Sequence, residues 1–298
     1  MPDPQSTPST DGVPTGSPGR RTALLAALAA VVVVVVVILL LAGGDDDDSS
    51  TTAASSEPLV VGVSPVPHGE ILDFVSRKLA PDAGLKLTIK PYDDYVQPNV
   101  ALEEGTLDAN YFQHVPYLDS QKKDNPSYDD LVPLRPVHLE PLGIYSRKVK
   151  DVKDVADGGT VTLSNDPANE ARGLKLLQQA GLIELKPDAP EDATPRDIAS
   201  NPRKLKFKTI APANLPRTLD DSDLAVINGN YAIEAKLTPA TDALVLEEAK
   251  GNPYSNLVVV KRENQDDPRI QKLEELLHSD EVRKFIEEQY RGSVIPSF

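Results

Sequence analysis

Hydrophobic residues between positions 59 and 298 recur with two different periods, and each period predicts one kind of element. Ile71, Val75 and Leu79 recur every four residues, which places them on one face of a helix. The segment LKLTIKPY, residues 85–92, instead alternates apolar and polar residues one by one, as a half-buried strand does. The periodicity therefore predicts a folded body built from both helices and strands.

The two patterns follow one another in order along the chain. Predicted strands lie within residues 59–65, 85–92, 160–166, 204–210, 219–228 and 256–262. Predicted helices lie within residues 69–84, 98–109, 167–181 and 266–290. Such alternation is typical of an α/β fold with a mostly parallel sheet, and a body of this length often forms two lobes. Ligands of such sheets bind in a crevice at the carboxyl ends of the strands, so the segments after strands are the candidates for chemistry.

The residues before this body predict three further pieces. Residues 1–22 are rich in Pro, Ser, Thr and Gly, and we expect them to be disordered and cytoplasmic. Residues 23–42 are uncharged and nearly all apolar, which is enough for a transmembrane helix of about 30 Å. Residues 43–58 predict a flexible linker. Because Arg20 and Arg21 precede the apolar run, the positive-inside tendency places the body outside the cytoplasm.

A long, cleaved secretory signal is the alternative reading of the apolar run. Such signals usually have about 7–15 apolar residues, followed by a small-residue cleavage site. The run here is longer, and no clear site of that kind follows it. We therefore expect a single-pass anchor in the cell membrane, with the binding domain on the extracytoplasmic side.

Charge and composition exclude several classes of partner and chemistry. The formal charge of −15 argues against nucleic acid or anionic lipid as the main partner, since both require a basic face. The chain has no cysteine, which excludes thiol catalysis, thiolate metal sites, disulfides and anchoring through a lipidated cysteine. The apolar content of 40% is ordinary for a globular protein, so a hydrophobic core is available.

The segment NYFQHVPYLD, residues 110–119, concentrates rings in a chain that has five Phe, four His and no Trp. If the segment is extended, Phe112 and His114 share one face, and Tyr117 follows after a turn at the proline. Tyr95 follows the preceding predicted strand and could join them. Rings suit an apolar or sulfur-containing ligand side chain, since a thioether gains about 1 kcal/mol at a ring edge. The alternative is that these rings only fill the core.

The segment SNDPANEARGLKLLQQAG predicts a helix whose beginning could bind an anion. Asp166 is a good N-cap, and Pro167 is a favoured first helical residue. Asn169 and Arg172 lie near that end, on the side opposite the apolar stripe. Free backbone N–H groups, the helix dipole and a guanidinium would together form a carboxylate site. The alternative is a surface arginine paired with Glu170 or a nearby aspartate.

The segment DLAVINGNY predicts a strand that ends at Asn228. The amide of Asn228 could offer both a donor and an acceptor to the ammonium and carboxylate of an amino acid, and Gly229 lets the chain approach closely. An ordinary Asn-Gly turn is the alternative. Together, the three segments suggest an amino-acid zwitterion held by polar groups, with its side chain against rings.

The body resembles the NlpA family of methionine-binding proteins, which serve ABC importers. The resemblance covers most of residues 59–298 and is carried by five ordered segments: GVSPVPHGEIL, DYVQPNVALEEGTLDANYFQHVPYLD, LSNDPANEARGLKLLQQAGLI, LPRTLDDSDLAVINGNYA and NPYSNLVVV. It implies a two-lobed, type II periplasmic-binding-protein fold that closes around its ligand. It also implies an extracytoplasmic solute-binding protein that delivers methionine, a related amino acid or a methionine-containing dipeptide to a membrane permease and, indirectly, to its ATPase.

The resemblance also implies a set of ligand-binding residues, all of which are present in matching segments. Those expected around the ligand side chain are Tyr95, Phe112, His114 and Tyr117. Those expected to hold the amino and carboxylate groups are Asn169, Arg172 and Asn228. No catalytic residue, metal or cofactor is implied. The N-terminus departs from the family, whose members are typically lipoproteins or lie free in a periplasm.

We place the first lobe at residues 59–140 plus 235–298 and the second at residues 141–234. The chain would then cross between lobes near Pro141 and Tyr231. A hinge at these crossings would let the lobes close and bury the ligand.

Two other classes of function compete with transport. In an extracellular enzyme, His114 would act as a general base that Asp108 or Asp119 orients. The sequence has no G-x-S-x-G or H-E-x-x-H motif, and His68 and Glu70 lack zinc-site spacing, which favours a loop before a helix. The remaining possibility is a membrane-tethered interaction domain without a transport role.

Overall fold

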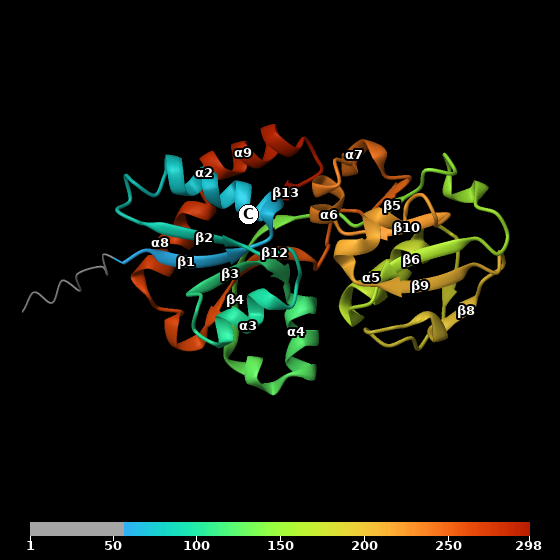
Figure 1. The fold of residues 1–298 in the computed structure, drawn as a ribbon, viewed down its shortest axis with the longest axis horizontal. Helices are drawn as coiled ribbons and strands as arrows, with labels where there is room; N and C mark the ends of the chain where they lie inside the picture. Colours follow the sequence, from blue (N-terminus) through green and yellow to red (C-terminus); the bar gives the residue numbers. More distant parts are fainter. Residues whose placement is uncertain (1–56) are drawn as a thin grey trace, which may run out of the picture. The chain divides into compact units, whose positions relative to one another are not determined.

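The computed structural model describes residues 57–298, so the predicted tail, anchor and nearly all of the linker lie outside the described residues. Within 57–298, no helix has both the length and the apolar character needed to cross a membrane. The described chain folds into two lobes, each with its own sheet and its own hydrophobic clusters (Figure 1).

The first lobe is built on a six-stranded sheet. Its strands, in spatial order, are β13 (Ile295–Pro296), β4 (Leu131–Leu139), β12 (Ser255–Lys261), β3 (Ala109–His114), β1 (Leu59–Val63) and β2 (Leu87–Pro91). One face packs on α2 (Glu70–Lys78), α8 (Pro268–Leu277) and α9 (Asp280–Tyr290). The other face packs on α3 (Gln97–Glu103), α4 (Val115–Asp124) and η2 (Pro126–Asp130). The short helices η1 (Pro65–Gly69) and η6 (Arg262–Asn264) follow β1 and β12.

The second lobe is built on a five-stranded sheet. Its strands, in spatial order, are β11 (Val245–Leu246), β5 (Gly143–Tyr145), β10 (Leu224–Ile227), β6 (Thr160–Ser164) and β9 (Lys206–Ile210). The helix α5 (Pro167–Gln179) packs on one face, and η5 (Pro212–Thr218) and α6 (Gly229–Glu234) pack on the other. Smaller elements complete the lobe: η3 (Val152–Asp154), β7 (Glu184–Leu185), η4 (Pro195–Asp197), β8 (Ile198–Ser200) and α7 (Pro239–Asp242).

Both sheets are mixed, so the prediction of a mostly parallel sheet is wrong. Strands β1, β2 and β3 are parallel, as are β6, β9 and β10. All of these except β3 were among the predicted strands, as was the antiparallel β12. Strands β4, β5, β11, β12 and β13 join them in antiparallel pairs. The antiparallel strands come from segments where the chain crosses between the lobes or ends, and such segments break the strand–helix alternation.

Most predicted elements form close to their predicted positions, with one division at the C-terminus. The single helix expected at 266–290 is two helices, α8 and α9, because Ser279 begins the second one. The Ser279 hydroxyl accepts a hydrogen bond from the Val282 backbone N–H at 3.3 Å, as an N-cap does. Of the four apolar residues predicted to form the buried stripe of this segment, Ile270, Leu273 and Leu277 are buried and Leu276 is half-buried.

The chain passes from the first sheet to the second between β4 and β5 and returns between β11 and β12. We call these segments, residues 140–142 and 247–254, the first and second crossings. Pro141 lies in the first crossing. Strand β11 pairs with β5 in the second sheet, although the predicted boundary at residue 235 would assign it to the first lobe.

Candidate ligand-binding site

A cavity lies between the lobes at the carboxyl ends of parallel strands, which is where the sequence predicts a ligand site. Strand β3 ends at His114, β10 ends just before Asn228, and β6 is followed by the start of α5. All seven side chains predicted to bind a ligand line this one cavity. The first lobe contributes Tyr95, Phe112, His114 and Tyr117, and the second contributes Asn169, Arg172 and Asn228.

The first-lobe side is an aromatic wall, which we define as Tyr95, Phe112 and Tyr117. Their ring centroids lie 5.8–6.0 Å apart, in tilted or edge-on arrangements. The Tyr117 hydroxyl donates to the Tyr95 carbonyl at 2.9 Å, and the Tyr95 hydroxyl donates to Asn230 Oδ1 at 2.5 Å. Phe112 and Tyr117 are buried but belong to none of the four hydrophobic clusters of the described residues. These two rings therefore line the cavity and do not fill a core, whereas Tyr111 faces the core.

His114 connects this wall to the second lobe. It is the N-cap of α4, where its Nδ1 accepts a hydrogen bond from the Tyr117 backbone N–H at 3.1 Å. The proton of the neutral ring is therefore on Nε2, which donates to Asn169 Oδ1 at 3.3 Å. Burial, helped by the nearby Arg172 charge, lowers the pKa of His114 to about 3. Neither expected orienter of a general base is in place, because Asp108 accepts from the Val60 N–H, Asp119 is exposed, and the His114 ring bonds Tyr117 and Asn169.

The second-lobe side is a polar wall, which we define as Asn169, Arg172 and Asn228. Asp166 caps α5 and accepts hydrogen bonds from both the backbone and the side-chain nitrogen of Asn169, each at 2.9 Å. Asn169 Oδ1 accepts in turn from Asn228 Nδ2 at 2.9 Å. Asn228 Oδ1 is buried and has no partner among the described groups. A buried acceptor without a donor costs about 1–3 kcal/mol, so this oxygen suits an N–H group of a ligand.

Arg172 is buried and paired, so the alternative of a surface arginine is wrong. Its Nη2 lies 2.5 Å from Glu247 Oε2 and also donates to the Glu140 carbonyl at 3.0 Å. The guanidinium stacks 4.3 Å from the centroid of the Tyr254 ring. No hydrogen bond from Nη1 to another described residue is formed, so that nitrogen keeps its donors for a carboxylate.

The prediction that the backbone N–H groups at the start of α5 are free is wrong for Asn169, because its N–H donates to Asp166 Oδ1. A partner that sequence reasoning missed is Glu247, which lies 75 residues beyond Arg172. Burial raises the pKa of Glu247, but the Arg172 charge and its hydrogen bonds outweigh burial and leave that pKa below its ordinary value. The guanidinium charge is thus partly balanced before any ligand binds.

Four other residues of the cavity were not predicted: Gln113, Glu140, Asn230 and Asn256. Among these unpredicted residues, Glu140 is the charged residue, and it lies in the first crossing. It stands in PVHLEPLGIY, where a lone carboxylate among apolar residues is the signal that could have identified it. A Cβ on Gly229 would lie 2.7 Å from Glu140 Cβ, so the glycine is needed for the chain to pass this close.

Comparisons with known proteins agree with this architecture. Residues 59–298 match the family model described as NlpA lipoprotein. The chain is 42% identical over 241 residues to the methionine-binding lipoprotein MetQ of Bacillus subtilis, covering 80% of this chain and 87% of that protein.

Two solved structures extend the comparison. One is a nutrient binding protein from Burkholderia cenocepacia bound to methionine, with a TM-score of 0.77 and 43% identity over 80% of this chain and 100% of that chain. The other is an ABC transporter periplasmic substrate-binding protein from Coxiella burnetii, with a TM-score of 0.76 and 38% identity over 80% of this chain and 100% of that chain. Because residues 59–298 match the family model, this chain belongs to the NlpA lipoprotein family.

Proposed function

We propose that this chain is the extracytoplasmic substrate-binding component of an ABC importer. It binds methionine, or a closely related amino acid or methionine-containing dipeptide, between its lobes and delivers it to a permease and its ATPase. The observation that carries the proposal is the pairing of an aromatic wall with a polar wall across one cavity. The names of the B. subtilis, B. cenocepacia and C. burnetii relatives support the ligand and the transport role.

In the proposed complex, each wall recognises one part of the ligand. Arg172 Nη1 donates to the ligand carboxylate, and Asn228 Oδ1 and the Glu140 carboxylate accept from its ammonium group. The thioether lies against Phe112 and Tyr117, where sulfur–ring contacts contribute about 1 kcal/mol each. Asn169 holds the Asn228 amide in the orientation that leaves its oxygen free.

The properties of His114 argue against the competing hypothesis of an extracellular enzyme, in which this residue would be the general base. A histidine whose pKa is about 3 remains neutral at physiological pH but is a weak general base. Its Nδ1 is occupied by the α4 backbone, and its Nε2 by Asn169. An interaction domain without transport would not need a buried, unpaired acceptor in its cleft.

We propose that residues 23–42 anchor the chain in the membrane as a single helix and that the linker keeps the body near the outer surface. The lipidated cysteine typical of the family has no counterpart in this cysteine-free chain. We also propose that the lobes move about the two crossings, with the second crossing between β11 and β12 in place of Tyr231. The membership of β11 in the second sheet favours this later boundary.

A thermal-shift screen of the full chain with the twenty amino acids tests the proposal. Copurified ligand is first removed by unfolding and refolding, because it would mask the shift. Methionine, alone or with few others, should raise the melting temperature, since a ligand at 100 times its Kd adds about 2.7 kcal/mol. A flat response to all amino acids and to methionine-containing dipeptides would reject the transport function.

A further inference from the structure

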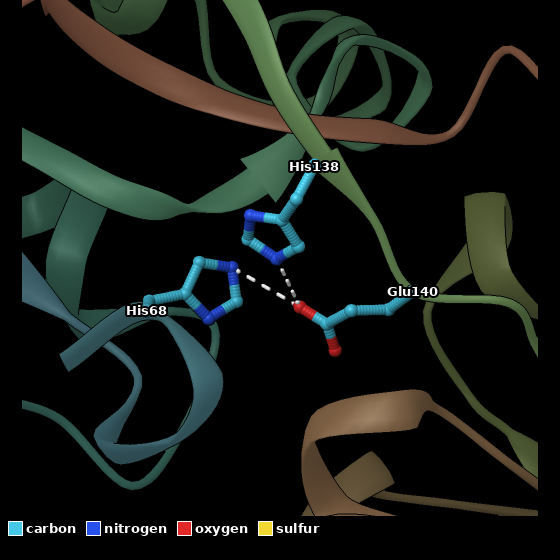
Figure 2. Close-up of side chains that lie close together, drawn as sticks. All are labelled: His68, His138 and Glu140. Atoms are coloured by element: carbon cyan, nitrogen blue, oxygen red, sulfur yellow. Dashed lines mark hydrogen bonds and ion pairs between the residues drawn. The ribbon is translucent and has the colours of Figure 1, made fainter. Parts of the chain in front are cut away.

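Two buried histidines of the first lobe hold the carboxylate of Glu140 at the wall of the cavity. His138 Nε2 lies 2.9 Å and His68 Nε2 3.3 Å from the same oxygen, Glu140 Oε1 (Figure 2). His68 comes from η1, His138 from the end of β4, and Glu140 from the first crossing. All three residues are 5% exposed or less, so the contact is shielded from bulk water.

The surrounding hydrogen bonds fix which groups donate. The Tyr111 hydroxyl contacts His138 Nδ1, so a neutral His138 that accepts there carries its proton on Nε2 and donates to Glu140. His68 Nε2 also lies 3.1 Å from Asn256 Oδ1, so its N–H is shared between two acceptors. The Asn230 backbone N–H is a third donor to the carboxylate. A carboxylate accepts about four hydrogen bonds, which leaves Glu140 room for one more partner in the cavity.

Neutral donors orient a carboxylate without cancelling its charge. Burial lowers the pKa of His68 to about 4 and that of His138 to about 3, so both rings are neutral at physiological pH. Glu247 is the contrasting carboxylate of this site, since its charge is balanced by a guanidinium 2.5 Å away. Burial raises the pKa of Glu140, while His68, Arg172 and the Asn230 amide oppose that rise. Among the described residues, no lysine or arginine pairs with the Glu140 carboxylate, so the position of its counter-ion is left to a ligand ammonium group.

We propose that His68 and His138 are positioning residues for ligand recognition, which hold the ionised Glu140 carboxylate where it meets the ligand ammonium group. This inference rests on the proposed function and deepens it. Under this inference, His68 and His138 help the site to distinguish a free amino acid from an analogue without an ammonium group, although neither side chain contacts the ligand. It also explains why the buried donors are imidazoles, since a lysine or arginine would neutralise Glu140.

The same three side chains have the composition of a two-histidine, one-carboxylate metal site. Their ligating atoms lie within 4.8 Å of one another. However, both Nε2 atoms converge on one carboxylate oxygen at hydrogen-bond distance. A zinc ion would need about 2.0–2.2 Å to each ligand around a shared centre, with Glu140 moved aside. The geometry therefore favours the hydrogen-bonded arrangement, and zinc binding becomes an outcome to test.

The experiment is calorimetric titration of the full chain with two ligands, methionine and 4-(methylsulfanyl)butanoate, which lacks only the amino group. The variants are Glu140→Gln, His138→Leu, His68→Leu and the conservative His138→Gln, whose amide can still donate. His278→Leu is the matched control, because this half-buried histidine bonds backbone carbonyls outside the cavity. A thermal melt of each variant reports whether it is folded.

We expect Glu140→Gln and both leucine variants to weaken methionine binding about 10- to 100-fold, as for a lost hydrogen bond to a charged group. Affinity for the des-amino analogue should change by less than about threefold, because that ligand has no ammonium group to lose contact. His138→Gln should recover most of the methionine affinity, and His278→Leu should leave both affinities unchanged.

Three results would overturn the inference. The first is equal weakening of both ligands in every variant, which would make the histidines merely structural. The second is unchanged methionine affinity in Glu140→Gln, the variant that alters packing least. The third is zinc that stabilises the wild type and loses that effect in His68→Leu. If the wild type binds neither ligand, methionine is not its ligand and this inference fails, whereas the transport function fails only if the thermal-shift screen is also flat.

Discussion

The aromatic wall, in which Tyr95 is half-buried, and the fully buried polar wall satisfy their polar atoms differently. On the aromatic wall, the tyrosine hydroxyls are paired with Asn230 and with the Tyr95 carbonyl, which leaves ring surface toward the cavity. On the polar wall, most groups bond one another, but Asn228 Oδ1 and Arg172 Nη1 keep free capacity. The difference separates two tasks. In the function that we propose, the polar wall recognises what all amino acids share, and the aromatic wall distinguishes their side chains.

Arg172→Ala should have the largest effect and should act on every amino-acid ligand alike. It removes the proposed carboxylate partner, so we expect at least a 100-fold loss of affinity, or about 3 kcal/mol. It also leaves Glu247 as a buried, unpaired charge, so the free energy of unfolding should fall by about 3–5 kcal/mol. Titration calorimetry and denaturant unfolding measure the two effects separately.

The double variant Arg172→Ala with Glu247→Gln separates binding from stability. Removing the orphaned charge should restore much of the stability without restoring affinity. Arg147→Ala is the matched control, because its pair with Asp220 is exposed and contributes about 1 kcal/mol or less. Recovery of full affinity in the double variant would remove Arg172 from the ligand site.

Phe112→Ala should change the preference among ligands more than it changes binding in general. We expect methionine affinity to fall about 10- to 50-fold, while alanine or serine, which do not reach the ring, lose about twofold or less. Competition titrations with these amino acids give the ratio. Phe74→Ala is the control, since that ring stacks on Phe285 outside the cavity. If all ligands weaken equally, Phe112 is a structural residue.

His114 should make the free energy of unfolding depend on pH. Its folded pKa of about 3 lies below the ordinary value of 6.5, so the unfolded state takes up a proton first as pH falls. Stability is therefore lost between about pH 6.5 and pH 3, by about 1.4 kcal/mol per pH unit for this residue. His114→Gln should reduce the slope of stability against pH by that amount in denaturant titrations at pH 4.5–6.5. An unchanged slope would show that the ring is not buried in its neutral form.

Tyr95→Phe should have the smallest effect, because it removes one hydrogen bond, from the Tyr95 hydroxyl to Asn230 of α6. Loss of the contact with Asn230 should weaken methionine binding about fivefold, or about 1 kcal/mol. Tyr92→Phe is the matched control, because Tyr92 packs against a first-lobe cluster. Equal affinities of the two variants would mean that the Tyr95 hydroxyl does not help the lobes to close on the ligand.

The sequence predicts one wall of the site better than the other. Phe112 and Tyr117 were identifiable because rings are rare in this chain, and strand periodicity placed Phe112 on the same face as His114. Arg172 was found as a residue, but its partner was not, because Glu247 reaches it only through strand β11. Local patterns cannot specify a contact between segments 75 residues apart.

The same limit applies to the fold and to the Glu140 contact. The parallel strands follow from alternation with helices, whereas the antiparallel strands depend on where the chain crosses between lobes. His68, His138 and Glu140 carry no shared spacing in the sequence, and the contact exists because η1, β4 and the first crossing meet. The available signal in the sequence was Glu140, a charged residue within an apolar run. It predicts that Glu140 is buried but does not identify His68 and His138 as its partners.

The most direct test of the account is a crystal structure of the chain bound to selenomethionine. Met1 is the sole methionine of the sequence and lies outside the described residues, so an anomalous peak in the cavity would come from the ligand. We expect one selenium peak against the rings of Phe112 and Tyr117, with the ligand carboxylate on Arg172. A selenium peak outside the cavity, or one beside Arg172 with the carboxylate toward the rings, would contradict it.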